Sequence, residues 1–302
     1  MSASARWIVT VVLLALATGT AVAGCFGVWA KRQALETDPW VDTSERVLKN
    51  EDVRDELGRE LSTRVFEIPA VQQQNASLSP EQTRELRRTV REKAPQVLGS
   101  KPALRAWRTA NRRAHELFLQ FLDDKRDTVS INVRALLAEV TEAAGLPDDV
   151  ADNVPRNIRN LQVISRGELQ SARKGADVLR ALAIILPLLA IALFAAAIVV
   201  APKRLWALAA TGGCLVLAAL TVIVLRRIGR GVVVDQLADT SQAKPAVQAT
   251  WSIGTSLLLT VAIVALVAGI LLALLAVAIN LIRTPRQDWD ARTEVMPPRA
   301  AP

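Results

Sequence analysis

Residues 181–201 read ALAIILPLLAIALFAAAIVVA, without a charged side chain, and they end at Pro202-Lys203-Arg204. After that link, residues 205–225 read LWALAATGGCLVLAALTVIVL and end at Arg226-Arg227. Because a helix rises ~1.5 Å per residue, each run is long enough to cross a hydrocarbon core of ~30 Å. The short link predicts an antiparallel pair of membrane spans, with a local kink at Pro187.

Two further apolar runs flank this pair, residues 7–30 and residues 251–282. The latter begins at Trp251 and is followed by Trp289, and tryptophans commonly anchor spans at the membrane interface. The sequence therefore predicts a mainly α-helical membrane protein. It has four transmembrane helices and a mostly helical soluble domain of residues 31–180, with up to two short strands.

The first run also has features of a secretory signal. Ala21-Val22-Ala23 fits a cleavage site, and residues 22–25, which end at Cys25, resemble a bacterial lipobox. The apolar run continues past both features, through Phe26 and Trp29. We therefore expect residues 7–30 to be an uncleaved signal anchor, with lipidation of Cys25 as the alternative.

The distribution of charge argues against nucleic-acid binding. The net charge is +8, but residues 31–180 carry 26 Lys or Arg against 24 Asp or Glu, so +6 of the total lies beside the apolar runs. Basic residues that flank spans are typical of membrane proteins. We expect the lipid bilayer, and no nucleic acid, as a partner.

The short segments between the spans predict the orientation. Four basic residues occur in residues 226–250, and seven occur in the segments on the other side: Arg6, Lys203, Arg204, Arg283, Arg286, Arg292 and Arg299. The richer side is expected to be cytoplasmic. The N-terminal residues 1–6 and a disordered tail of residues 283–302 would then be cytoplasmic, whereas residues 31–180 and the loop 226–250 would be extracytoplasmic.

Periodic patterns divide residues 31–180 into helices. Val53, Leu57, Leu61 and Val65 recur every four residues, which predicts a helix over residues 50–67 with Asn50 as its cap. A polar linker is expected over residues 72–79. Further predictions are a helix from a Ser79 capping box to residue 98, a helix over 100–122, a strand over 127–133, a helix ending at Gly145, a weaker strand over 160–164, and a helix from Ser165 into the second span.

Residues 107–115 read WRTANRRAH and contain the pattern W-x-x-A-N-R-x-A-H, and Gly145-Leu146-Pro147 forms a G-L-P turn. With the order of the spans, these stretches resemble an uncharacterised family of actinobacterial integral membrane proteins. The excess of Arg over Lys, 29 to 8, is typical of a GC-rich genome. The resemblance implies the layout of one anchor, an outer domain and three closing spans, but no activity.

Common catalytic and cofactor motifs are absent from the sequence. His115 is the only histidine, and Cys25 and Cys214 both lie in apolar runs, so we expect no metal site, no cofactor and no catalytic residue of a known type. Nucleotide-binding and hydrolase motifs are also missing. No charged residue lies centrally in a span, which disfavours an ion-coupled transporter.

Trp107, Asn111 and His115 share one face of the predicted helix over residues 100–122. They could form a polar cluster that binds a ligand or transfers a proton. The alternative is a structural stripe, in which Trp107 packs and the other two bond to neighbouring backbone. We favour the structural interpretation, because a lone histidine beside aromatic residues more often fills a core position.

Residues 84–113 contain ten Lys or Arg against two Glu, while acidic segments lie on either side. Helical spacing predicts two basic stripes. The first is Arg84, Arg87, Arg88 and Arg91; the second is Arg105, Arg108 and Arg112. Either they pair with the acidic helices, which we favour, or they face outward and bind anionic lipid headgroups or envelope polymers.

These observations together favour a non-enzymatic protein of the cell membrane. Its outer domain would bind a partner, either another envelope protein or an anionic envelope polymer. One alternative is an envelope enzyme that uses carboxylates or His115. Another is an accessory transporter subunit that lacks coupling charges of its own.

Overall fold

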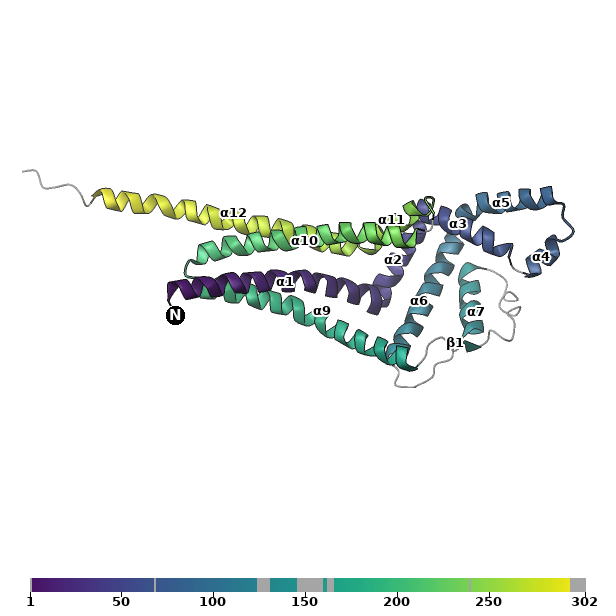
Figure 1. Cartoon of the computed structure of the whole chain (residues 1–302), viewed down its shortest axis with the longest axis horizontal. Coiled ribbons are helices and arrows are strands. Elements are labelled where there is room, and N and C mark those ends of the chain that lie inside the picture. Colours follow the sequence, from purple (N-terminus) through teal and green to yellow (C-terminus); the bar gives the residue numbers. More distant parts are fainter. Residues whose placement is uncertain are drawn as a thin grey trace, which may run out of the picture. The chain divides into compact units, whose positions relative to one another are not determined.

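The computed structural model describes residues 2–67, 69–123, 131–145, 160–161, 166–238 and 240–293 (Figure 1). The chain forms two compact units. The apolar unit contains residues 1–28, 181–226 and 257–302, and the polar unit contains residues 29–180 and 227–256. The helices are α1 (Ala3–Leu35), α2 (Thr37–Lys49), α3 (Glu51–Val65), α4 (Pro69–Asn75), α5 (Pro80–Leu98), α6 (Lys101–Asp123), α7 (Val133–Ala144), α9 (Arg166–Val200), α10 (Arg204–Leu237), α11 (Lys244–Gly254) and α12 (Ser256–Thr293).

Within the described residues, four helices are long and apolar enough to cross a membrane. The segments are Ala3–Leu35, Gln170–Val200, Arg204–Leu237 and Ser256–Ile282. Large apolar side chains such as Ile191 and Val199 lie exposed on them, 65% and 69% respectively. Four spans were predicted from the sequence, and the structure confirms four such helices, as expected for a multi-pass membrane protein.

Small residues bring the helices of the apolar unit close together. Ala17 of α1 and Ala197 of α9 are fully buried in one cluster. A Cβ atom on Gly24 would lie 3.2 Å from the backbone nitrogen of Pro187, which stands inside the continuous helix α9. Such close approach of backbones is typical of helix packing in membranes, where small residues replace a hydrophobic core.

The helices end at places that hydropathy did not predict. α10 continues past Arg226 to Leu237, and α11 follows, so the expected loop 226–250 is largely helical, and residues 227–250 belong to the polar unit. The last apolar helix begins at Ser256 rather than at Trp251, and it continues to Thr293. α12 thus extends into the segment that was expected to be a disordered tail, and residues 294–302 lie outside the described residues. Hydropathy marks where lipid contact ends, whereas backbone hydrogen bonding can extend a helix beyond that point.

The predicted caps are present in the polar unit. The Asn50 side chain accepts a hydrogen bond of 3.2 Å from the Val53 amide at the start of α3. Ser79 and Gln82 form the reciprocal capping box at the start of α5. Gly145 ends α7 with a φ of +71°, a conformation that favours glycine. The polar linker from Gln72 is wrong in its first half, because α4 extends to Asn75.

The strand predictions correspond to one very short pairing. β1 (Ile131–Asn132) pairs antiparallel with β2 (Asn160–Leu161) over two residues each. Val133, expected in the first strand, instead begins α7. Residues 127–130 and 162–164, which complete the two predicted strands, lie outside the described residues, as does the predicted cap Ser165.

Candidate functional site

Helix α6 is fixed to α2 through the stripe that carries Trp107. The Trp107 indole N–H donates a hydrogen bond of 3.1 Å to the Ser44 carbonyl, and Asn111 Nδ2 donates one of 2.9 Å to the Trp107 carbonyl. Farther along α6, His115 Nδ1 lies 3.2 Å from Thr37 Oγ1. The order of these partners along α2 is reversed, so the two helices run antiparallel.

The ring of His115 is buried. It is 5% exposed and stacks on Trp40, with the ring centroids 5.4 Å apart. Its Nε2 atom has no hydrogen-bond partner among the described residues. Burial lowers the pKa of His115 below its ordinary value, although the Ala34 backbone and Glu116 act in the opposite direction. The stripe thus differs in part from the structural interpretation: Asn111 bonds to neighbouring backbone as expected, whereas the His115 ring contacts a hydroxyl side chain and packs on Trp40.

The second basic stripe pairs with neighbouring helices. Arg108 of α6 forms ion pairs with Glu45 and Asp42 of α2, and Arg112 pairs with Asp38 at 2.7 Å. Glu45 is the centre of this network. Hydrogen bonds from Lys49 and then Arg108 lower the pKa of its carboxyl group, against the opposing effect of burial. Arg105, the third arginine of this stripe, contacts backbone instead: its Nε donates a hydrogen bond of 3.4 Å to the Ala143 carbonyl of α7.

The first basic stripe behaves differently. Its arginines are exposed on α5, and they line an open hollow of about 350 Å³. Within the described residues, only Arg88 among them pairs with a carboxylate, that of Glu92 on the same helix. No Asp or Glu contributes to the described lining. We call this feature the arginine hollow; its lining residues are Ser62, Thr63, Arg84, Arg87, Arg88 and Arg91.

Close packing of α3 on α5 shapes the arginine hollow. A Cβ atom on Gly58 would lie 3.0 Å from the Pro95 ring, so α5 approaches α3 closely at this point. Toward the other end of α3, the Arg87 guanidinium lies 4.9 Å from the centre of the buried Phe66 ring. This cation–π contact holds one guanidinium at the hollow.

Sequence reasoning identified the four arginines but missed Ser62, Thr63 and Phe66. A signal was available, because Gly58 and Ser62 are four residues apart and mark the face of α3 on which α5 packs.

The donors and acceptors of the hollow define what it can bind. The Ser62 and Thr63 hydroxyls both donate to the Arg59 carbonyl, at 2.7 and 3.1 Å. The guanidinium N–H groups are therefore the donors that face the hollow. Arginine presents its N–H groups as a planar fork that fits phosphate or carboxylate oxygens. The described lining contains no carboxylate or imidazole, and its guanidinium groups can bind anions.

The described part of the chain contains no candidate metal site. Among those residues, no three His, Cys, Asp or Glu side chains are grouped so that they could hold a metal ion. No protein family, curated protein or solved structure matches this chain. Any role of the arginine hollow must therefore be inferred from its own residues and geometry.

Proposed function

We propose that this chain is a multi-pass protein of the cell envelope that binds a polyanion, without catalysis, in the arginine hollow. The observation that carries the proposal is that four arginines surround one hollow whose described lining contains no carboxylate. Helix geometry separates Arg84 and Arg91 by ~10 Å along the axis of α5. A ligand that contacts all four arginines therefore carries several charges, as a phosphate-rich or carboxylate-rich polymer or a group of lipid headgroups does.

The proposed orientation places the polar unit outside the cell and both termini in the cytoplasm, following the basic residues of the short segments. A hydrogen bond supports the number of spans. Arg59 of α3 donates to the side chain of Gln242 at 2.7 Å, and two of the four apolar helices separate these residues in the sequence. Two crossings return the chain to the same side of a membrane, so these two segments can pack together.

The binding experiment uses the full-length protein in nanodiscs of zwitterionic lipid, with a fluorescent inorganic polyphosphate as the probe. We expect binding that weakens as salt is added, because the contacts are exposed and electrostatic. The Arg87→Glu/Arg91→Glu variant reverses two charges in the hollow and should weaken binding at least tenfold. The control, Lys93→Glu/Lys101→Glu, changes the net charge equally at exposed positions outside the described lining and should bind like the wild type.

A second arm separates the two sources of anions. Liposomes with anionic lipid are offered to the same nanodiscs, with and without polyphosphate as a competitor. Binding of polyphosphate alone identifies a polymer ligand, whereas binding of liposomes that polyphosphate displaces identifies lipid headgroups. The proposal is wrong if neither binds at low salt, or if the control variant loses binding as the arginine variant does.

The orientation is tested separately by labelling a single cysteine. In a Cys25→Ala/Cys214→Ala background, Ser77→Cys places the label in the polar unit. We expect a membrane-impermeant maleimide to react in intact cells. Reaction only after permeabilisation would overturn the proposed orientation and leave the binding result unaffected.

A further inference from the structure

One end of the apolar unit gathers the ends of three helices. α1 begins at Ala3, α9 ends at Val200 and α10 begins at Arg204. Arg6 Nε donates a hydrogen bond of 3.0 Å to the Val200 carbonyl, which joins the first of these ends to the second. Because these helices are candidate spans, this end corresponds to the boundary between hydrocarbon and headgroups.

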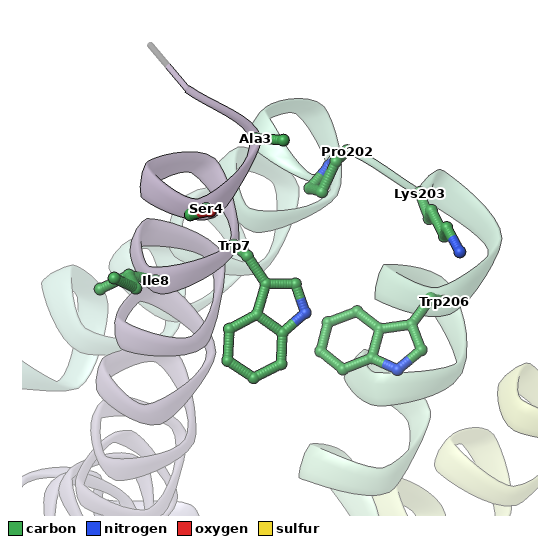
Figure 2. Close-up of a pocket in the computed structure, with 7 residues that line it drawn as sticks. All are labelled: Ala3, Ser4, Trp7, Ile8, Pro202, Lys203 and Trp206. Carbon is green, nitrogen blue, oxygen red and sulfur yellow. The ribbon is translucent and has the colours of Figure 1, made fainter.

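Two tryptophans meet at this end. Figure 2 shows Trp7 from α1 and Trp206 from α10 with their rings side by side, and the ring centroids are 5.8 Å apart. Both side chains remain substantially exposed, at 50% and 42%. They line an open hollow of about 660 Å³ together with Ile8, Pro202 and Lys203. We call it the tryptophan hollow.

The tryptophan hollow continues on the other side of Trp206. A neighbouring hollow of about 510 Å³ shares Lys203 and Trp206, and Ala276, Val277 and Leu281 of α12 complete its apolar wall. An apolar surface thus extends along the helices from a basic rim. That combination matches a phospholipid, which has an anionic group at one end and acyl chains at the other.

The charge at this rim is positive. Lys203 and Arg204 form no ion pair with a described residue, and neither hollow has an Asp or Glu in its described lining. The indole N–H groups of Trp7 and Trp206 also donate no hydrogen bond to a described residue. These indole N–H donors and basic side chains therefore lie at the depth of the lipid phosphates.

We propose that the tryptophan hollow is a binding site for an anionic phospholipid. Lys203 and the indole N–H groups contact the headgroup phosphate, and an acyl chain lies against Ile8 and the indole rings. The unbalanced positive charge selects an anionic over a zwitterionic headgroup, and the apolar wall selects a lipid over a soluble phosphate. The site is separate from the arginine hollow and does not depend on the proposed polyanion binding.

The test counts lipids on the delipidated full-length protein by native mass spectrometry. Phosphatidylglycerol, phosphatidylcholine and soluble glycerol phosphate are each titrated. We expect the first phosphatidylglycerol to bind about fivefold more tightly than phosphatidylcholine, the effect of one Lys near an anionic group, and glycerol phosphate not to bind. Lys203→Gln should remove this preference, while Arg227→Gln, farther along α10 and outside both hollows, should retain it.

A second variant separates the hydrogen bond to phosphate from the selection by charge. Trp206→Phe keeps an aromatic ring but removes an N–H donor to the phosphate that both lipids carry, so it should weaken the binding of both lipids and leave the preference for phosphatidylglycerol in place. Equal binding of the two lipids to the wild type overturns the proposal. The proposal is also wrong if the preference survives Lys203→Gln, or if a second copy of the chain occupies the hollow instead of lipid.

Discussion

Gly212 of α10 and Gly269 of α12 pack backbone to backbone, so closely that a Cβ atom on either would lie 2.6 Å from the carbonyl oxygen of the other. Gly212→Ala therefore forces the two helices apart. Overpacking of this kind costs about 1–3 kcal/mol, more than the roughly 1 kcal/mol that alanine contributes to a helix relative to glycine. We expect a lower Tm in thermal unfolding of the detergent-solubilised protein.

The neighbouring Gly213 provides a matched control. A Cβ atom at this position meets nothing within 4 Å, so Gly213→Ala should leave the Tm unchanged or raise it. If both substitutions change the Tm equally, the effect comes from helix propensity, and the close contact between α10 and α12 has no particular role.

The ion pair between Glu45 and Arg108 should couple the stability of α2 and α6. Glu45 is largely covered, with 18% of its side chain exposed, whereas Arg64 and Glu60 of α3 form an exposed pair. In double-mutant cycles with glutamine, we expect about 1 kcal/mol for the first pair and a few tenths for the second. Equal coupling energies would show that the partial burial of Glu45 has no effect.

Acid should weaken this pair. Because the pKa of Glu45 is lowered in the folded protein, the stabilisation is present above the pKa of the unfolded chain, ~4.3, and is lost as the pH falls through the folded value. The Tm difference between Glu45→Gln and the wild type should therefore shrink in strong acid. A difference that stays constant below pH ~4 contradicts this assignment.

His115 should make the stability depend on pH in a higher range than Glu45 does, closer to neutral. Its pKa is lowered in the folded state, so as the pH falls through ~6.5 the unfolded chain binds the proton first. The free energy of unfolding then decreases until the pH reaches the folded pKa. His115→Phe keeps a ring against Trp40 and cannot titrate, so the Tm of the wild type should fall relative to this variant between pH ~7.5 and ~5. Parallel curves would show that burial does not depress the pKa.

The sequence predicted the helices with strong local signals. Asn50 and Ser79 were recognised because their side chains cap the nearest amides, and the spans were recognised because lipid demands long apolar runs. α2 was missed, although Val41 and Leu48, seven residues apart, are both fully buried. Two apolar positions are too few to predict a helix from the sequence. Their burial depends on the packing of α6 on α2.

Contacts between distant segments could not be predicted. α11 packs on α2 and α3, and Trp29 Nε1 donates a hydrogen bond of 2.8 Å to the Gly254 carbonyl. No local pattern shows that residues 227–256 complete the polar unit. The two basic stripes have similar sequences but different partners in the fold. α6 packs on α2, whose acidic side chains pair with the second stripe. α5 packs on uncharged positions of α3, so the first stripe lines the arginine hollow instead.

The arginine hollow makes a prediction about lysine. Arg87→Lys/Arg91→Lys keeps both charges but replaces two planar forks with single ammonium groups, and the cation–π contact of Arg87 with Phe66 becomes less favourable. We expect polyphosphate affinity to fall by about three- to tenfold, less than in the double glutamate variant, as two-pronged contacts become single ones. The salt dependence should remain that of the wild type, because the number of charges is unchanged. Wild-type affinity in the lysine variant would mean that α5 offers only diffuse positive charge, and a loss as large as that of the glutamate variant would mean that arginine geometry, rather than charge, carries nearly all of the binding.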